Sequence, residues 1–76
     1  QASWDNAVAY MQRAIAIRPE FIYHHYDLAL IYIDTKQWSL ARQQLELIPA
    51  LPLIDVMDPV WKKEAAGFLQ SIANKK

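Results

Sequence analysis

The sequence predicts an all-α fold of about four antiparallel helices, stacked as repeated helical hairpins. First, one pattern of four residues recurs further along the chain at a constant offset: Trp4, Ala7, Met11 and Ala14, then Trp38, Ala41, Leu45 and Ile48. A fixed period of this length is typical of stacked-repeat proteins. Second, all four prolines lie between apolar-periodic segments, as expected if those segments are helices. Third, no segment alternates with period two, so strands are not expected.

Composition narrows the class of protein. The 76 residues, of which 54% are apolar, are enough for one small domain over residues 1–76. Eight basic and eight acidic side chains cancel, so nothing favours nucleic acid or an anionic membrane surface. There is no cysteine and no apolar run near the ~18 residues that a membrane-spanning helix needs. Because the chain starts at Gln1 without a methionine, we expect a mature, cleaved or excised segment, and the sequence does not indicate a compartment.

The first two helices are expected over residues 3–17 and 20–35. Ser3 is the expected N-cap of the first helix, and Pro19 follows its end. The apolar face of this helix consists of Trp4, Ala7, Val8, Met11, Ala14 and Ile15. The second helix has two apolar sides: Leu28, Ala29 and Tyr32, then Tyr23, Tyr26, Leu30 and Ile33. A helix that is apolar nearly all round is either buried or binds something on the side left over.

The last two helices are expected over residues 38–48 and from residue 58 onward. Pro49 and Pro52 end the third helix, and residues 49–57 form an apolar connector. Asp58 is the expected N-cap of the fourth helix, with Pro59 at its first position. Gly67 lies inside this helix, where we expect it to allow close packing by a neighbouring side chain.

These residues resemble the tetratricopeptide repeat family, in which each unit is an antiparallel pair, helix A then helix B. The family's helix B pattern is complete in Trp4, Ala7, Met11, Ala14 and Pro19. Leu28, Ala29 and Tyr32 fit helix A of the next unit, and Trp38, Ala41 and Leu45 fit its helix B. The departures are Ile48 for a small residue, an early Pro49, Lys36–Gln37 for the turn glycine, and His25 where Trp is common.

The resemblance implies a division of the chain and a function. Residues 3–19 are helix B of a partial repeat, residues 20–52 a full repeat, and residues 58–74 a C-terminal capping helix of a longer repeat protein. The implied function is a protein–protein interaction scaffold that holds a peptide or partner segment on the concave helix A face. The candidate contact residues are Tyr23, Tyr26, Asp27, Leu30, Ile33 and Asp34. A neighbouring helix that covers this face is the competing interpretation.

A second hypothesis is structural self-association. The first helix is a helix B without its helix A, and stacked repeats usually need about three units for stability. We therefore expect Val8, Met11 and Ile15 to lack a partner within the chain. Either upstream repeats cover them, or two copies pack these faces together as a homodimer.

No residue pattern predicts catalysis, a cofactor or a metal site. His24 and His25 are adjacent, and successive helical residues point about 100° apart, so they cannot share one metal ion. We expect His25 to be partly buried and His24 to be exposed. Asp55 and Asp58 bracket a turn, where capping is a commoner role than cation binding. No serine or carboxylate spacing suggests a catalytic set, so an enzyme is not expected.

Overall fold

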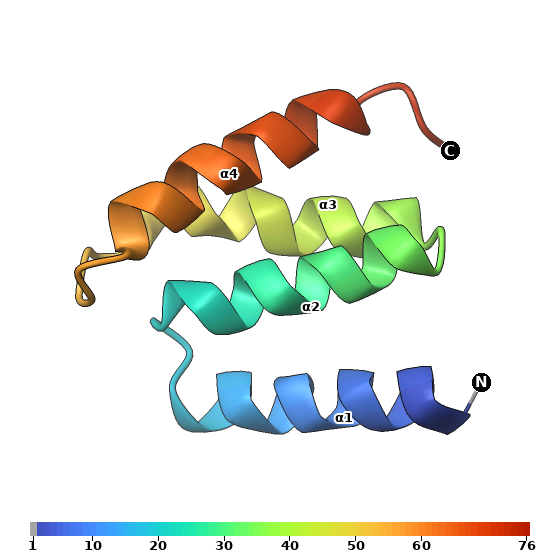
Figure 1. The fold of residues 1–76 in the computed structure, drawn as a ribbon, viewed down its shortest axis with the longest axis horizontal. Helices are drawn as coiled ribbons and strands as arrows, with labels where there is room; N and C mark the ends of the chain where they lie inside the picture. Colours follow the sequence, from blue (N-terminus) through green and yellow to red (C-terminus); the bar gives the residue numbers. More distant parts are fainter. Residues whose placement is uncertain (1) are drawn as a thin grey trace.

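The computed structural model describes residues 2–76, so Gln1 of the predicted domain lies outside the described residues. It confirms the all-α fold with four antiparallel helices (Figure 1). The described elements are α1 (Ala2–Ile17), α2 (Ile22–Asp34), α3 (Trp38–Leu47), the 3₁₀ turn η1 (Ile48–Ala50) and α4 (Asp58–Ser71). The predicted bounds hold to within two or three residues, which is the precision that helix ends allow.

Helix α2 is the centre of the molecule. It packs against α1 on one side and α4 on the other, and α3 lies behind α2 and α4 (Figure 1). Ala29 of α2 and Ala41 of α3 are completely buried, and their small side chains let these two helices approach closely. Leu28 and Leu45 fill the space between them. The periodic alanine and leucine positions are therefore core positions, as the sequence pattern predicts.

The turn between α2 and α3 is built without glycine. The Lys36 amide donates to the Ile33 carbonyl at 3.0 Å, and the Gln37 amide donates to the Tyr32 carbonyl at 2.8 Å. This pair of bonds is a Schellman motif, which requires a left-handed residue at the first position after the cap. Lys36 occupies that position with a φ of 60°. A non-glycine residue in this conformation costs about 1 kcal/mol or more.

Replacing Lys36 with glycine should raise the free energy of unfolding by about 1 kcal/mol, because glycine adopts positive φ without a steric cost. Urea denaturation of the two proteins measures this difference. Gln37→Gly is the matched control, because Gln37 has a φ of −95° and gains nothing from glycine. If Lys36→Gly is no more stable than the parent, the turn does not hold the left-handed conformation.

Two aspartates close the entry to α4, though not as the sequence analysis predicts. Asp58 is fully buried, and its Oδ2 accepts from the amides of Ile54 and Asp55, each at 2.7 Å. Asp55 Oδ1 in turn accepts from the Met57 amide at 3.0 Å. The two aspartates therefore hold the connector against the start of α4, whose N-cap is Met57, a residue without a side-chain cap bond. Asp58 as N-cap is therefore wrong, because its carboxylate points back to the connector.

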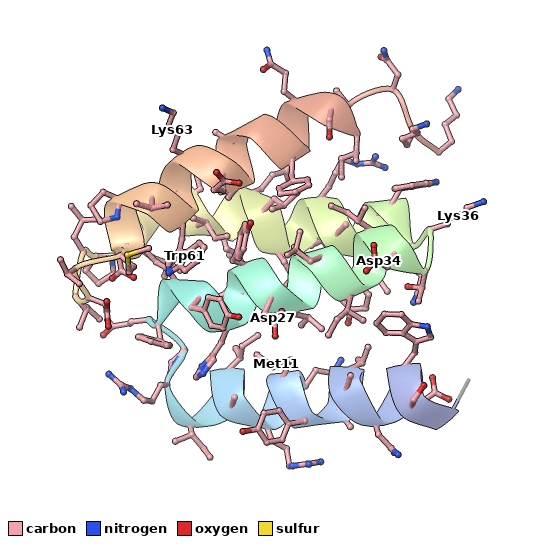
Figure 2. The ribbon with its side chains drawn as sticks, viewed as in Figure 1. Met11, Asp27, Asp34, Lys36, Trp61 and Lys63 are labelled. Atoms are coloured by element: carbon pink, nitrogen blue, oxygen red, sulfur yellow. The ribbon has the colours of Figure 1, made fainter. Side chains whose placement is uncertain are left out.

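Helix α1 also differs from the prediction in two ways. It begins at Ala2, so Ser3 lies inside its first turn and is not the N-cap. Val8, Met11 and Ile15 do not form a free face, because α2 covers them. Met11 is only 6% exposed and lies between α1 and α2 in Figure 2, while Val8 and Ile15 are partly buried against the same core. The expectation that these three residues lack a partner is wrong.

Candidate partner-binding site

An aromatic cluster joins α2 to α4. The Tyr26 ring stacks on Trp61 with centroids 5.1 Å apart and an interplanar angle of 30°, and it lies 6.2 Å from the Phe68 ring. Tyr23, one turn earlier, lies 5.2 Å from Trp61. Tyr26 is only 7% exposed, whereas Tyr23 is 38% exposed. The two tyrosines therefore differ in role: Tyr26 anchors α4, and Tyr23 is accessible at the edge of the cluster.

The six residues predicted to face a partner separate into two groups. Tyr26 is buried beneath α4, and Ile33 is half-buried against the core. Tyr23 and Asp34 are exposed, while Asp27 and Leu30 are half-buried. Figure 2 shows Asp27 and Asp34 along α2. The competing interpretation, a neighbouring helix on this side of α2, therefore holds for Tyr26, because α4 covers that part of the surface.

Helix α4, which the sequence predicts only as a C-terminal capping helix, adds a part of the site. A shallow hollow of about 330 Å³ lies on its surface, and Phe68 is one of its walls. The remaining lining residues are Lys63, Glu64, Gly67 and Ser71. Phe68 also contacts Tyr26, so the hollow is continuous with the aromatic cluster. We call the combined surface the α2–α4 face: Tyr23, Asp27, Leu30, Asp34, Glu64, Gly67, Phe68 and Ser71.

The α2–α4 face carries three carboxylates, Asp27, Asp34 and Glu64. The pKa of Tyr26 is raised, first by its burial and then by the negative charge of Glu64, with smaller contributions from Tyr23 and Asp27. Carboxylates from both helices thus act on the same phenol. Asp34 extends the acidic surface along α2, and Lys63 is the single cation among the described residues that line the hollow. The face combines partly exposed apolar side chains with carboxylates.

Gly67 does not receive a neighbouring side chain, contrary to the prediction. A Cβ built on Gly67 meets no atom within 4 Å. Its conformation is ordinary helix, so no special φ explains glycine here. The absent side chain instead deepens the hollow on α4, which is open to solvent.

Gly67→Ala should therefore stabilise the chain by about 1 kcal/mol, the usual difference between these residues inside a helix. The thermal midpoint should rise by roughly 4–8 °C, as expected for a domain of this size. Calorimetry of the two proteins measures it. Ala66→Gly is the reciprocal control at the neighbouring exposed position and should destabilise by a similar amount. A Gly67→Ala protein that is less stable than the parent would mean that this position is packed.

The two histidines are structural. His25 is 4% exposed; its Nε2 donates to the Pro19 carbonyl at 2.7 Å, and its Nδ1 lies 2.8 Å from the side-chain amide of Gln44. It thereby ties α2 to α3 and to the turn after α1. His24 is half-buried rather than exposed, because its ring packs edge-on against Phe21 with centroids 4.8 Å apart.

Burial lowers the pKa of His24 below its ordinary value of 6.5, and the nearby charges of Arg18 and His25 add to this effect. The unfolded chain therefore binds more protons than the folded chain between the two pKa values. This contribution to stability is complete above pH 6.5 and is lost as the pH falls through the folded-state pKa. We expect His24→Gln to flatten the dependence of the thermal midpoint on pH between about 7.5 and 5. An unchanged slope would contradict this assignment.

Within residues 2–76, no group of three or more His, Cys, Asp or Glu side chains is placed to hold a metal ion. None of the helices in the same range is long and apolar enough to cross a membrane.

The fold and the surface together define a helical repeat protein built from antiparallel hairpins. Comparison with protein families agrees: a model described as tetratricopeptide repeat matches residues 1–52. The chain belongs to the tetratricopeptide repeat family. This family consists of non-catalytic scaffolds that generally serve as protein–protein interaction modules. Neither the curated proteins nor the solved structures contain a match.

Proposed function

We propose that this chain is a non-catalytic interaction module whose α2–α4 face binds a partner segment with alternating basic and apolar side chains. The observation that carries the proposal is the pairing of accessible apolar groups with carboxylates on one surface. Tyr23 is exposed on α2, Leu30 is half-buried against the core beside it, and Phe68 lines the hollow on α4. Interfaces of this kind are anchored by aromatic side chains within a polar rim.

The charge of the partner follows from the carboxylates. Asp27, Asp34 and Glu64 lie on the face, against one lysine at the hollow. A lysine or arginine of the partner would meet opposite charge along α2, whereas an acidic segment would meet like charge. The hollow beside Phe68, about 330 Å³ in volume, has room for one aliphatic side chain of the partner. A second copy bound through Val8, Met11 and Ile15 is not proposed, because α2 already covers these residues.

Fluorescence anisotropy with two labelled peptides of equal length tests this assignment. One peptide alternates lysine with leucine, and the other alternates glutamate with leucine. We expect saturable binding of the lysine peptide, weakened by salt, and no binding of the glutamate peptide. Removing two carboxylates with Asp27→Asn and Asp34→Asn should weaken binding roughly 5-fold to 10-fold, because each exposed charge pair contributes up to about 1 kcal/mol.

Glu46→Gln is the matched control for these variants. Glu46 is an exposed carboxylate on α3, which lies behind α2 and α4, so its loss lowers the negative charge but leaves the α2–α4 face intact. Binding by Glu46→Gln should equal that of the parent. If the control weakens binding as much as the double variant, the lysine peptide is held by net charge alone and not by this face.

A further inference from the structure

One accessible ring of the α2–α4 face is held in place by its neighbours. The Tyr23 ring lies 5.2 Å from the ring of Trp61, at an interplanar angle of 53°, and Figure 2 shows Trp61 beside the start of α2. The Tyr26 ring lies 6.3 Å from Tyr23, at 40°. Tyr23 is nevertheless 38% exposed. An aromatic side chain that is supported from two helices loses little conformational freedom when a partner binds to its free surface.

A carboxylate lies one helical turn from this ring. Asp27 follows Tyr23 by four residues on α2, and side chains at this spacing are neighbours on a helix. Asp27 is half-buried, so solvent screens its charge less than that of a fully exposed carboxylate. The pKa of the Tyr26 phenol is raised first by burial and then by Glu64, Tyr23 and Asp27, so Asp27 acts on the same aromatic cluster. We call Tyr23 and Asp27 the Tyr23–Asp27 pair.

The chemistry of the pair favours arginine over lysine. A planar guanidinium can stack on an aromatic ring and donate two parallel hydrogen bonds to a carboxylate, whereas the lysine ammonium is a compact, strongly hydrated charge. The chain itself contains such a contact, because the guanidinium carbon of Arg18 lies 4.9 Å from the centroid of the Phe21 ring. Lys75 Nζ lies 5.6 Å from the centroid of Trp38. Both cations are therefore engaged with rings other than Tyr23.

We propose that the Tyr23–Asp27 pair receives an arginine side chain of the partner segment in preference to a lysine. This inference rests on the proposed function, since both residues belong to the α2–α4 face. The guanidinium stacks on the exposed side of the Tyr23 ring, and its N–H groups donate to the Asp27 carboxylate. The partner segment is therefore basic through arginine, and an apolar neighbour of that arginine enters the hollow beside Phe68.

Two labelled peptides that differ only in their cation test this preference. One is the lysine–leucine peptide, and the other has arginine at every lysine position, so that length, charge and apolar content are matched. Fluorescence anisotropy measures the two affinities under the same salt conditions. We expect the arginine peptide to bind the parent about 5-fold more tightly, which is the effect of one cation–π contact at a partly exposed site.

Three variants locate the preference on the surface. Tyr23→Leu removes the aromatic ring but keeps an apolar side chain, so the two peptides should bind equally. Tyr23→Phe keeps the ring and should keep the 5-fold difference. Tyr10→Leu is the matched control, because Tyr10 is 63% exposed on α1 and has Arg13, rather than a carboxylate, one turn further along. Its preference should equal that of the parent. Circular dichroism verifies that each variant keeps the helix content of the parent.

The proton signals of the bound arginine provide a second readout. Stacking on a ring should move the δ-methylene signals of the peptide's arginine upfield with the parent and with Tyr23→Phe, but not with Tyr23→Leu. Equal binding of the two peptides by the parent, or a preference that survives in Tyr23→Leu, overturns the arginine site and leaves the proposed function intact. If neither peptide binds the parent, the proposed function and the arginine site are both wrong.

Discussion

Replacing Tyr26 with alanine should destabilise the fold by roughly 3 kcal/mol, the usual cost of removing a large buried aromatic ring. Tyr26 is 7% exposed and contacts both Trp61 and Phe68, so the variant leaves a cavity between α2 and α4. A domain of this length has a total stability of about 4–11 kcal/mol. The loss is therefore a large share of the total, and α4 should separate from the rest first. Urea denaturation, together with amide hydrogen exchange in α4, measures both effects.

Two control variants test whether the loss of stability in Tyr26→Ala comes from removal of its aromatic ring. Tyr26→Phe keeps the stacking on Trp61 and should stay within about 1 kcal/mol of the parent, as volume-conserving changes usually do. Tyr23→Ala removes a ring that is already 38% exposed and should cost less than half as much as Tyr26→Ala. If Tyr26→Ala and Tyr23→Ala are equally mild, α4 is not anchored through Tyr26. The prediction that Tyr26 is a candidate contact residue for a partner would then regain support.

Asp58→Ala should cost about 3 kcal/mol, because a hydrogen bond to a charged group contributes about 1.5–3 kcal/mol and the variant loses two of them. The Asp58 carboxylate, fully buried, is the acceptor for the amides of Ile54 and Asp55 at 2.7 Å each. The connector before α4 depends on these two bonds, so its exchange protection should be lost as well. Thermal denaturation and hydrogen exchange of residues 54–58 measure the two consequences.

Two further variants show how much of this stability depends on the oxygen of Asp58 that accepts the hydrogen bonds. Asp58 Oδ1 is buried and accepts no hydrogen bond from the described residues, so Asp58→Asn can place its amide nitrogen there and keep the bonded oxygen. That variant should cost only about 1 kcal/mol, a typical single hydrogen-bond difference. Asp55→Ala removes only the exposed acceptor of the Met57 amide and should also cost about 1 kcal/mol. An Asp58→Ala protein no less stable than Asp55→Ala would contradict the assigned bonds.

Much of the fold was predictable because it depends on local rules. The apolar spacing of α1, α3 and α4 places their buried sides correctly, and the prolines mark the connections. The repeat period identifies Ala41 and Leu45 as core before any contact is known. These features depend only on helical periodicity and on the size of side chains at repeated positions.

Side-chain partners across elements were not predictable in the same way. The roles of Asp55 and Asp58 depend on how the connector folds, and both residue types are favourable at any helix start. The left-handed Lys36 is visible in the sequence only as a departure from the usual turn glycine, because lysine itself has no preference for that conformation. His25 could be expected to be buried, but its bonds to Pro19 and Gln44 join three segments that only the tertiary structure brings together.

The sequence was enough to predict which side of α2 carries the candidate site, but not which residues on that side are accessible. The second apolar side of α2 is visible in the sequence, whereas the extent of its coverage by α4 is not. That coverage depends on the angle at which α4 leaves the connector. It buries Tyr26 and leaves Tyr23 accessible. The Gly67 hollow was missed because a glycine inside a helix has two interpretations, close packing and open space, which only the surroundings distinguish.

Chemical-shift mapping tests the central claim most directly. The ¹⁵N-labelled chain is titrated with the lysine–leucine peptide while its amide signals are followed. Binding on the α2–α4 face predicts shifts at Asp27, Leu30, Asp34, Glu64 and Gly67, with little change in the amides of α1. Shifts confined to α1 or to the back of α3, or none at saturating peptide, would contradict this assignment.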